Sequence, residues 1–162
     1  MTISTGDTLP AATLLTMGAN GAEQVDLGAK LKGRKVVLFG LPGAFTGTCS
    51  EAHLPSFMRT KPGFDAKGVD EVICLSGNDP FVMKAWGETT GATAAGITLL
   101  GDPSGDFIMA IGMEMNNPAL GLRNRSRRFS ALVEDGVVTH LNLEVSPGTC
   151  EISAGETLLA AI

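Results

Sequence analysis

The sequence predicts an α/β fold in which helices flank a mixed central sheet. Short apolar, β-rich runs alternate with helical segments over the first two thirds of the chain, and a strong hairpin signal follows them. Strands joined through helices run parallel, whereas hairpin strands run antiparallel. We therefore expect the parallel part of the sheet to come first and the antiparallel part last.

Two apolar runs have the composition of strands that are buried on both faces, Lys35 to Gly43 and Val69 to Gly77. The second run is followed by a predicted helix, with Asp79 as its N-cap and Pro80 in its first turn. The segment "GITLLGDPSGDFIMAIGM" predicts a third short strand, a turn and a short helix that begins near Asp106.

The C-terminal part of the chain predicts a hairpin and a final helix. Asp135 and Gly136 lie between two β-rich runs and form the strongest turn signal in the sequence. The segment "ISAGETLLAAI" predicts a short amphipathic helix. Because no repeat, low-complexity tract or linker interrupts the chain, residues 1–162 are predicted to form one domain.

The composition excludes several classes of partner. The 162 residues carry a formal net charge of −5, which argues against nucleic acid or an anionic membrane as the main partner. The first residues do not show a basic region followed by an apolar core, and no apolar run reaches the ~20 residues that span a bilayer. We expect a cytoplasmic protein, and a mature organellar protein would have the same features.

The three cysteines, Cys49, Cys74 and Cys150, have neither C-x-x-C spacing nor the spacing of a zinc site. With only two histidines in the chain, we expect no metal and no other cofactor. An odd number of cysteines also argues against a disulfide framework. Redox or nucleophilic chemistry at a thiol is the remaining expectation.

The stretch "LPGAFTGTCSEAHLP" places Cys49 just after a predicted central strand, at the end of the sheet where open α/β folds bind ligands. Thr48 is predicted to cap a helix that begins at Cys49, and Glu51 has the spacing of a capping box. Cys49 would then lie among backbone N–H groups that favour an anion. We expect it to be a thiolate.

A helix terminus alone is too weak for this purpose. Lowering the pKa of a thiol from about 8.5 to about 6 takes about 3.4 kcal/mol, whereas a helix terminus supplies about 0.3–1 kcal/mol. The chain therefore needs a cation, and four arginines cluster within six residues: Arg123, Arg125, Arg127 and Arg128. Arg128 opens a predicted strand on the face opposite Phe129. A solvated basic patch is the alternative interpretation of this cluster.

Other chemistries of the loop lack the residues they need. A phosphate-binding P-loop requires a lysine, and none lies between Gly40 and Arg59. A cysteine phosphatase requires an arginine soon after the thiol, and Arg59 is too distant. His53 lies at i+4 from Cys49, so a Cys–His pair is conceivable, although Pro55 is expected to disturb that helix at once. A catalytic base and a structural hydrogen-bonding residue both stay open for His53.

The segment "PGAFTGTCS", preceded by "KVVLFGLPG" and followed by "EAHLP", resembles the active-site signature of peroxiredoxins, the thioredoxin-fold thiol peroxidases. The resemblance is closest to the type II subfamily, also called type 5 or atypical two-cysteine. It extends over nearly the whole chain through "VDEVICLSGNDPFVMKAW", "LLGDPSGDF", "GLRNRSRRFSALVEDGVV" and "LNLE". It implies a thioredoxin-like fold and the reduction of hydrogen peroxide and alkyl hydroperoxides.

The resemblance also implies roles for individual residues. Cys49 corresponds to the peroxidatic cysteine, and Thr46 to the residue whose hydroxyl hydrogen-bonds the peroxide. Pro42 corresponds to the residue that shields the pocket, and Arg128 to the guanidinium that stabilises the thiolate and the transition state. The chain departs from the pattern at Gly47, where subfamily members commonly carry proline, so we expect a less preorganised loop and a modest loss of activity.

After attack on peroxide, the resemblance implies a sulfenic acid on Cys49 that must be reduced. Cys150 is the first candidate for a resolving cysteine and Cys74 the second. Otherwise glutaredoxin with glutathione, or thioredoxin, would act on Cys49 directly. The resemblance favours a homodimer. The alternative function is a redox sensor or binding protein that uses the same cysteine without turnover.

Overall fold

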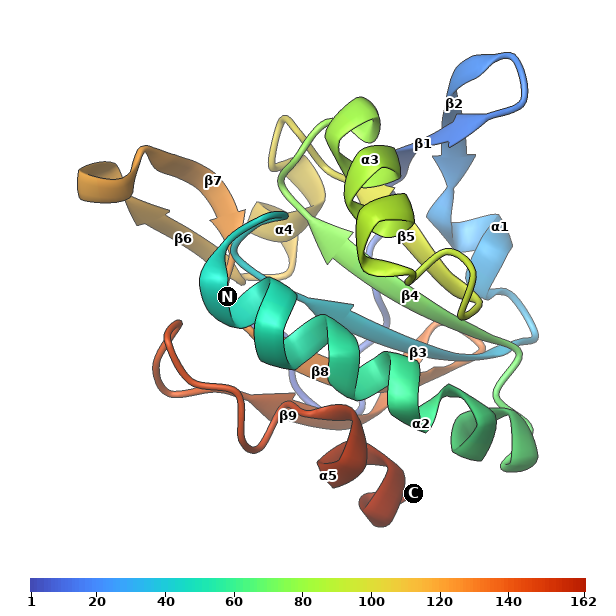
Figure 1. The fold of residues 1–162 in the computed structure, drawn as a ribbon. Helices are drawn as coiled ribbons and strands as arrows, with labels where there is room; N and C mark the ends of the chain where they lie inside the picture. The colour runs from blue at the N-terminus through green and yellow to red at the C-terminus, as the bar shows by residue number, and fades with distance from the viewer.

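The computed structural model describes residues 1–162 as a seven-stranded sheet with the order β2-β1-β5-β4-β3-β8-β9, and a separate pair β6-β7 (Figure 1). The strands are β1 (Thr13–Gly18), β2 (Gly21–Asp26), β3 (Lys35–Gly40), β4 (Glu71–Ser76), β5 (Ile97–Gly101), β6 (Glu114–Asn117), β7 (Leu122–Ser126), β8 (Phe129–Glu134) and β9 (Val137–Leu143). The helices are α1 (Leu27–Leu31), α2 (Leu54–Ala66), α3 (Pro80–Thr90), α4 (Asp106–Ala110) and α5 (Gly155–Ala161), with a π-helical turn at Cys49–His53 and a 3₁₀ turn at Pro118–Leu120.

The predicted mixed sheet is confirmed. Strands β3, β4 and β5 are parallel, and β8 and β9 add to β3 as an antiparallel pair. The expectation that the parallel part comes first is wrong, because an antiparallel hairpin of β1 and β2 precedes it. This hairpin was missed because β2 has the polar sequence "GAEQVD" and is an edge strand with mostly exposed side chains.

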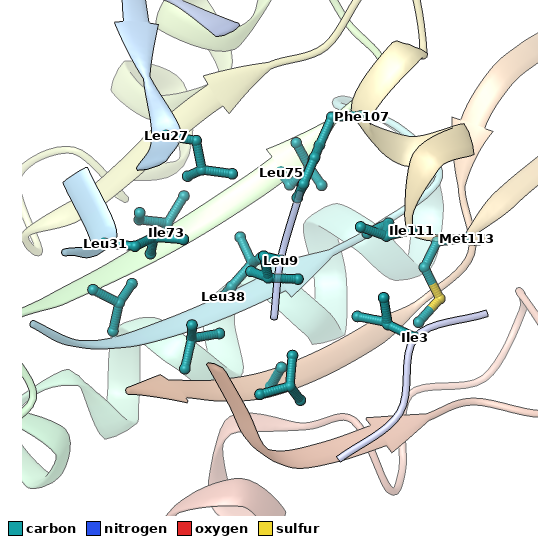
Figure 2. Close-up of a cluster of buried hydrophobic side chains, with 14 of the residues drawn as sticks. Ile3, Leu9, Leu27, Leu31, Leu38, Ile73, Leu75, Phe107, Ile111 and Met113 are labelled. Carbon is teal, nitrogen blue, oxygen red and sulfur yellow. The ribbon is translucent and has the colours of Figure 1, made fainter. Parts of the chain in front are cut away.

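The core has two layers, one on each face of the sheet, because side chains alternate along the central strands. Leu38 belongs to the layer under α1 and α4, and the next residue, Phe39, belongs to the layer under α2, α3 and α5. Figure 2 shows the first layer, in which strand residues meet side chains from α1, the α4 region and the N-terminal segment: Ile3, Leu9, Leu27, Leu31, Leu38, Ile73, Leu75, Phe107, Ile111 and Met113.

The start of α3 and the turn between β8 and β9 form where local sequence signals predicted them. The Asp79 carboxylate accepts a hydrogen bond from the Val82 N–H at 2.9 Å, and Pro80 is the first residue of α3. Asp135 and Gly136 connect β8 to β9 with φ angles of 48° and 78°, the left-handed backbone that a two-residue hairpin turn requires. The helix from Asp106 and the final helix also form.

No helix has the length and hydrophobicity needed to span a bilayer.

Candidate active site

The loop after β3 leads directly into the π-helical turn that begins at Cys49. The Leu54 N–H donates to the Cys49 carbonyl, and α2 continues from there to Ala66. The expected disturbance at Pro55 is wrong, because this residue lies in the first turn of α2, where its fixed φ suits a helix.

The predicted capping box is also wrong. Thr48 has helical dihedral angles, with φ −61° and ψ −33°, and its side chain makes no capping hydrogen bond. Its hydroxyl instead donates to the Gly148 carbonyl at 3.1 Å. Glu51 is exposed. The helical turn already includes Gly47 and Thr48, so Thr48 lies inside it rather than at its cap, and the Thr48 side chain contacts a segment from the C-terminal part of the chain.

The sulfur of Cys49 lies beside a buried guanidinium. Cys49 is 1% exposed and Arg128 is 2% exposed. The Arg128 Nη2 donates a hydrogen bond to the Cys49 Sγ over 3.2 Å. Arg128 immediately precedes β8, and the next residue, Phe129, packs in the core layer on the other face of the sheet. The structure thus pairs the thiol of Cys49 with a buried positive group, the arrangement that favours negative charge on a sulfur.

Arg128 is itself held from two further sides. Its Nη1 donates to the His53 Nδ1 at 3.0 Å, and its Nη2 and Nε donate to the Pro147 carbonyl at 3.0 and 3.4 Å. The His53 Nε2 lies 3.1 Å from the Ser153 carbonyl. Since a carbonyl only accepts, Nε2 carries the ring proton and Nδ1 is the acceptor. The guanidinium is therefore fixed in orientation as well as in position.

His53 is a neutral imidazole with no free lone pair. Burial, and secondarily the positive charge of Arg128, lower its pKa from 6.5 to about 3. Because both ring nitrogens are already used in hydrogen bonds, the geometry does not provide a general base here. His53 supports Arg128 instead.

The start of the loop after β3 lines the same cavity as Cys49. Pro42 is buried, and the Thr46 hydroxyl donates to the Gly43 carbonyl at 2.7 Å. This bond leaves the lone pairs of the Thr46 oxygen available to accept a hydrogen bond. Gly47 is exposed and helical, and a side chain added there would meet no neighbouring atom within 4 Å.

Two residues from other parts of the chain, Asn78 and Arg125, hold this loop through hydrogen bonds. The Asn78 Oδ1 accepts hydrogen bonds from the Ala44 N–H at 2.9 Å and from the Ser76 hydroxyl at 2.6 Å. The Arg125 Nη1 donates to the Pro42 carbonyl at 3.0 Å. The arginine cluster is therefore not one basic patch, since Arg128 and Arg125 both serve the site. Arg123 is exposed and Arg127 is partly exposed.

A cavity of about 450 Å³ opens above these groups. Cys49, Arg128, Pro42 and Thr46 line its floor, and apolar side chains of the β6–β7 region form much of its rim: Met115, Leu120 and Leu122. The cavity is large enough for a peroxide and is bounded on one side by the hydrocarbon groups of this rim.

The other two thiols differ in accessibility. Cys74 is completely buried in β4, and burial raises its pKa well above its usual value. Cys150 is half-buried in the segment before α5, and burial raises its pKa as well. All three cysteines are free thiols.

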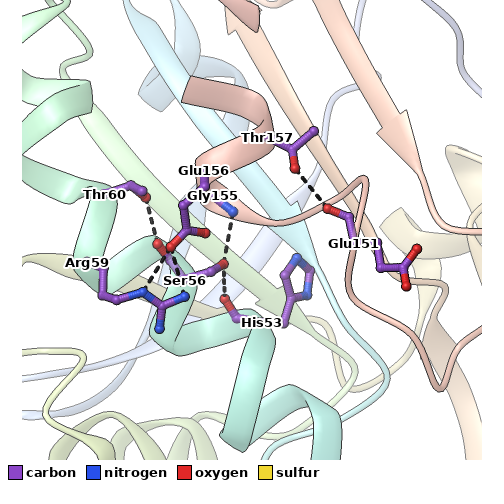
Figure 3. A network of polar contacts seen from close by, with 8 residues as sticks. All are labelled: His53, Ser56, Arg59, Thr60, Glu151, Gly155, Glu156 and Thr157. Carbon is purple, nitrogen blue, oxygen red and sulfur yellow. Dashed lines mark hydrogen bonds and ion pairs between the residues drawn. The ribbon is translucent and has the colours of Figure 1, made fainter. Parts of the chain in front are cut away.

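The sequence did not identify the groups that hold Cys49, Arg128 and the loop before Cys49 in place. Asn78 lies in a turn signal but carries no mark of its role, and the carbonyls of Pro147 and Ser153 have no side-chain signature. Figure 3 shows how the start of α5 is fixed beside His53: the Ser56 hydroxyl donates to the His53 carbonyl at 2.6 Å and accepts from the Gly155 N–H at 2.9 Å. These contacts become visible only in the folded chain.

Comparison with known proteins places the chain in a family. The family model described as Redoxin matches residues 4–159. The chain is 44% identical to the chloroplastic Peroxiredoxin-2E-2 of Oryza sativa, covering 99% of this chain and 73% of that protein, and 41% identical to Peroxiredoxin-2C of Arabidopsis thaliana, covering 99% and 98%. The reduced Prx3 of Vibrio vulnificus in complex with H2O2 superposes with a TM-score of 0.92 at 45% identity, covering 98% of both chains.

The thioredoxin-like sheet, together with the similarity to peroxiredoxins, defines the class of protein: a thiol peroxidase, an oxidoreductase that acts on peroxide. The chain belongs to the redoxin family, and within it to the type II peroxiredoxins.

Proposed function

We propose that Cys49 is the peroxidatic residue and attacks the distal oxygen of hydrogen peroxide or a small alkyl hydroperoxide as a thiolate. A sulfur–oxygen bond forms while the O–O bond breaks, so the sulfur is oxidised to a sulfenic acid. The other peroxide oxygen leaves with the electron pair of the broken bond and takes up a proton, giving water or an alcohol. The single observation that carries this proposal is the 3.2 Å contact between the Arg128 Nη2 and the Cys49 Sγ.

In this proposal Arg128 stabilises the thiolate and the negative charge that develops on the peroxide oxygens. The Thr46 hydroxyl, whose proton is donated to the Gly43 carbonyl, accepts a hydrogen bond from the peroxide and orients its O–O bond. Pro42 excludes water from one side of the sulfur. His53 positions Arg128 without transferring a proton. What supports these roles is the cavity that Cys49, Arg128, Thr46 and Pro42 line together, and the hydrogen bonds of Arg128, Thr46 and His53.

The experiment is peroxide consumption with a thiol reductant, measured for the wild type and Cys49→Ser. We expect the variant to lose activity to the level of the uncatalysed reaction. Cys74→Ala is the matched control, because Cys74 is buried away from the cavity, and we expect it to keep wild-type activity. A Cys49→Ser protein that still consumes peroxide contradicts the proposal. A single stoichiometric oxidation without turnover supports the redox-sensor alternative.

We propose Cys150 rather than Cys74 as the resolving residue. Cys74 is fully buried within the central sheet, so a disulfide with it requires the core to open. Cys150 lies outside helices and strands and is half-buried, so a local rearrangement suffices to move it. Non-reducing mass spectrometry after one equivalent of peroxide tests this assignment. A Cys49–Cys74 disulfide contradicts it, and a mixed disulfide with glutathione indicates direct reduction by glutaredoxin and glutathione.

Thioredoxin and glutaredoxin with glutathione are the proposed reductants, and turnover with each, supplied separately, ranks them. A homodimer is the proposed assembly. Phe45 and Leu120, at the active-site loop and the cavity rim, are 57% and 71% exposed, which supports an apolar contact there. Sedimentation of the wild type and a Leu120→Lys variant tests the dimer. A cytoplasmic location is proposed, and since the relatives include chloroplastic and mitochondrial proteins, cell fractionation tests it.

A further inference from the structure

One segment after β9 supplies the carbonyls that hold the active-site cation. The Pro147 carbonyl accepts from Arg128, and the Ser153 carbonyl accepts from His53, which in turn accepts from Arg128. Both carbonyls belong to the segment Val145–Ser153, which is neither helix nor strand. The position of the guanidinium therefore depends on the conformation of a stretch that has no regular hydrogen-bond ladder of its own.

The backbone of this segment makes few hydrogen bonds to itself. The Thr149 N–H donates to the Ser146 carbonyl at 3.2 Å, and the Ala154 N–H donates to the Glu151 carbonyl at 3.4 Å. Such a stretch needs fixed partners from outside to hold a single conformation.

The Glu144 carboxylate provides these partners. Its Oε1 accepts from the Glu151 N–H at 2.6 Å, from the Ser153 N–H at 2.9 Å and from the Ser153 hydroxyl at 2.9 Å. The Thr149 hydroxyl lies 3.4 Å from the Glu144 Oε2 and 3.0 Å from the Ser146 carbonyl, so these two acceptors share its one proton. The Glu144 side chain thus ties the middle and the end of the segment to the residue that directly follows β9.

This carboxylate is buried without an ion pair. Glu144 is 4% exposed, and no lysine or arginine lies within ion-pair distance of it. Burial raises its pKa, but the hydrogen bonds from Ser153 and Glu151 outweigh that effect, so the pKa is lowered overall. Only backbone N–H and hydroxyl donors compensate this charge. Because these donors belong to the segment Val145–Ser153, the buried carboxylate and the conformation of the segment stabilise each other.

We propose that Glu144 is a positioning residue for the peroxidase reaction: its carboxylate fixes the segment Val145–Ser153, whose carbonyls in turn fix Arg128 against Cys49. The backbone supports the same connection from the other side, because the Glu144 N–H donates to the Arg128 carbonyl at 3.0 Å. The inference rests on the proposed function of Cys49. Glu144 itself does not line the cavity that holds the sulfur.

The test is the second-order rate of Cys49 oxidation by hydrogen peroxide in single-turnover experiments, with each variant shown by circular dichroism to be folded. Removing the carboxylate in Glu144→Ala is expected to slow this rate about tenfold or more, because Arg128 loses its fixed geometry. Alkylation of Cys49 by iodoacetamide, which needs no oriented peroxide, is expected to fall less than about threefold. A merely structural role would not separate the two rates in folded protein.

Conservative variants keep the test decisive. Glu144→Gln retains an oxygen acceptor for the two N–H groups, so we expect its peroxide rate to stay within about threefold of the wild type. If Glu144→Ala does not fold, Glu144→Asp replaces it in the test. Its shorter side chain is expected to slow the oxidation of Cys49 by peroxide about threefold or more. Glu134→Ala removes an exposed carboxylate from the same hairpin and is the matched control, with an unchanged rate.

A folded Glu144→Ala protein that reacts with peroxide as fast as the wild type overturns the inference and leaves the role of Cys49 intact. A Glu144→Gln protein as slow as Glu144→Ala overturns its hydrogen-bonding basis. A loss of peroxide reactivity in Glu144→Ala is distinguishable from failure of the proposed function. If the proposed function fails, peroxide does not oxidise Cys49 even in the wild type.

Discussion

Replacing His53 by asparagine is expected to change how the stability of the protein depends on pH. In the folded protein the His53 pKa is about 3, because the ring is buried and accepts a hydrogen bond from Arg128. In the unfolded chain the ring takes up a proton at its ordinary pKa of 6.5. Between these two values the unfolded state therefore binds one proton more than the folded state.

The two pKa values of His53 determine the direction and the size of the change in unfolding free energy. The stability that the neutral ring contributes is fully present above pH 6.5 and is lost as the pH falls toward 3. Each pH unit inside this window costs about 1.4 kcal/mol, so lowering the pH from 6.5 to 5 removes about 2 kcal/mol. Asparagine offers an oxygen acceptor to Arg128 near the place of Nδ1 and does not titrate, so this loss is absent from the variant.

The assay is urea unfolding followed by circular dichroism at pH 7.5 and pH 5. Between these conditions the unfolding free energy of the wild type should fall by about 2 kcal/mol more than that of His53→Asn. His140→Asn is the control, because His140 lies on β9 away from Arg128 and should leave the wild-type pH dependence in place. Equal pH dependence in the wild type and His53→Asn would refute a buried neutral imidazole.

Three further substitutions test contacts of the site and of its support. Arg128→Lys should slow peroxide oxidation of Cys49 about 100-fold or more in single-turnover kinetics, because one ammonium cannot reach the sulfur, the imidazole and the carbonyl together; a rate within threefold contradicts this. Asn78→Ala should reduce the same rate about tenfold while circular dichroism stays unchanged, since the Ala44 N–H of the loop and the Ser76 hydroxyl at the end of β4 lose their shared acceptor. Gly155→Ala should lower the unfolding free energy by about 1–3 kcal/mol in urea titrations, because a Cβ there would clash with Thr60 and with the Ser56 carbonyl.

Elements with strong local signals were predictable from the sequence. Asp79 with Pro80 begins a helix, and Asp135 with Gly136 forms a two-residue turn, because in each case neighbouring residues alone determine the backbone. The hairpin of β1 and β2 was not predictable in the same way. The polar residues of β2 pair only with β1 and make few core contacts, so its strand state depends on tertiary pairing rather than on hydrophobic alternation.

The residues of the candidate site differ in the same way, because some carry a signal in the sequence and others do not. The proposed reactive thiol, Cys49, and its proposed cation, Arg128, carry chemical signals in the sequence: a cysteine after the loop that follows a strand, and an uneven cluster of arginines. The groups that hold them do not: His53 meets Arg128 across 75 positions, and the Ser153 carbonyl meets His53 across 100. Thr48 is a residue type that commonly caps helices, but its hydroxyl donates a hydrogen bond to the Gly148 carbonyl instead. Long-range contacts of this kind replaced the local bonds that were predicted.

The most direct test of the account is to trap the sulfenic acid with dimedone after one equivalent of hydrogen peroxide at pH 7, and to locate it by mass spectrometry in the wild type and in Arg128→Lys. In the wild type we expect rapid oxidation of Cys49, found as the dimedone adduct or as a disulfide with Cys150, and almost no oxidation on the same timescale in the variant. Modification mainly at Cys74 or Cys150, or equal modification of Cys49 in both proteins, would contradict it.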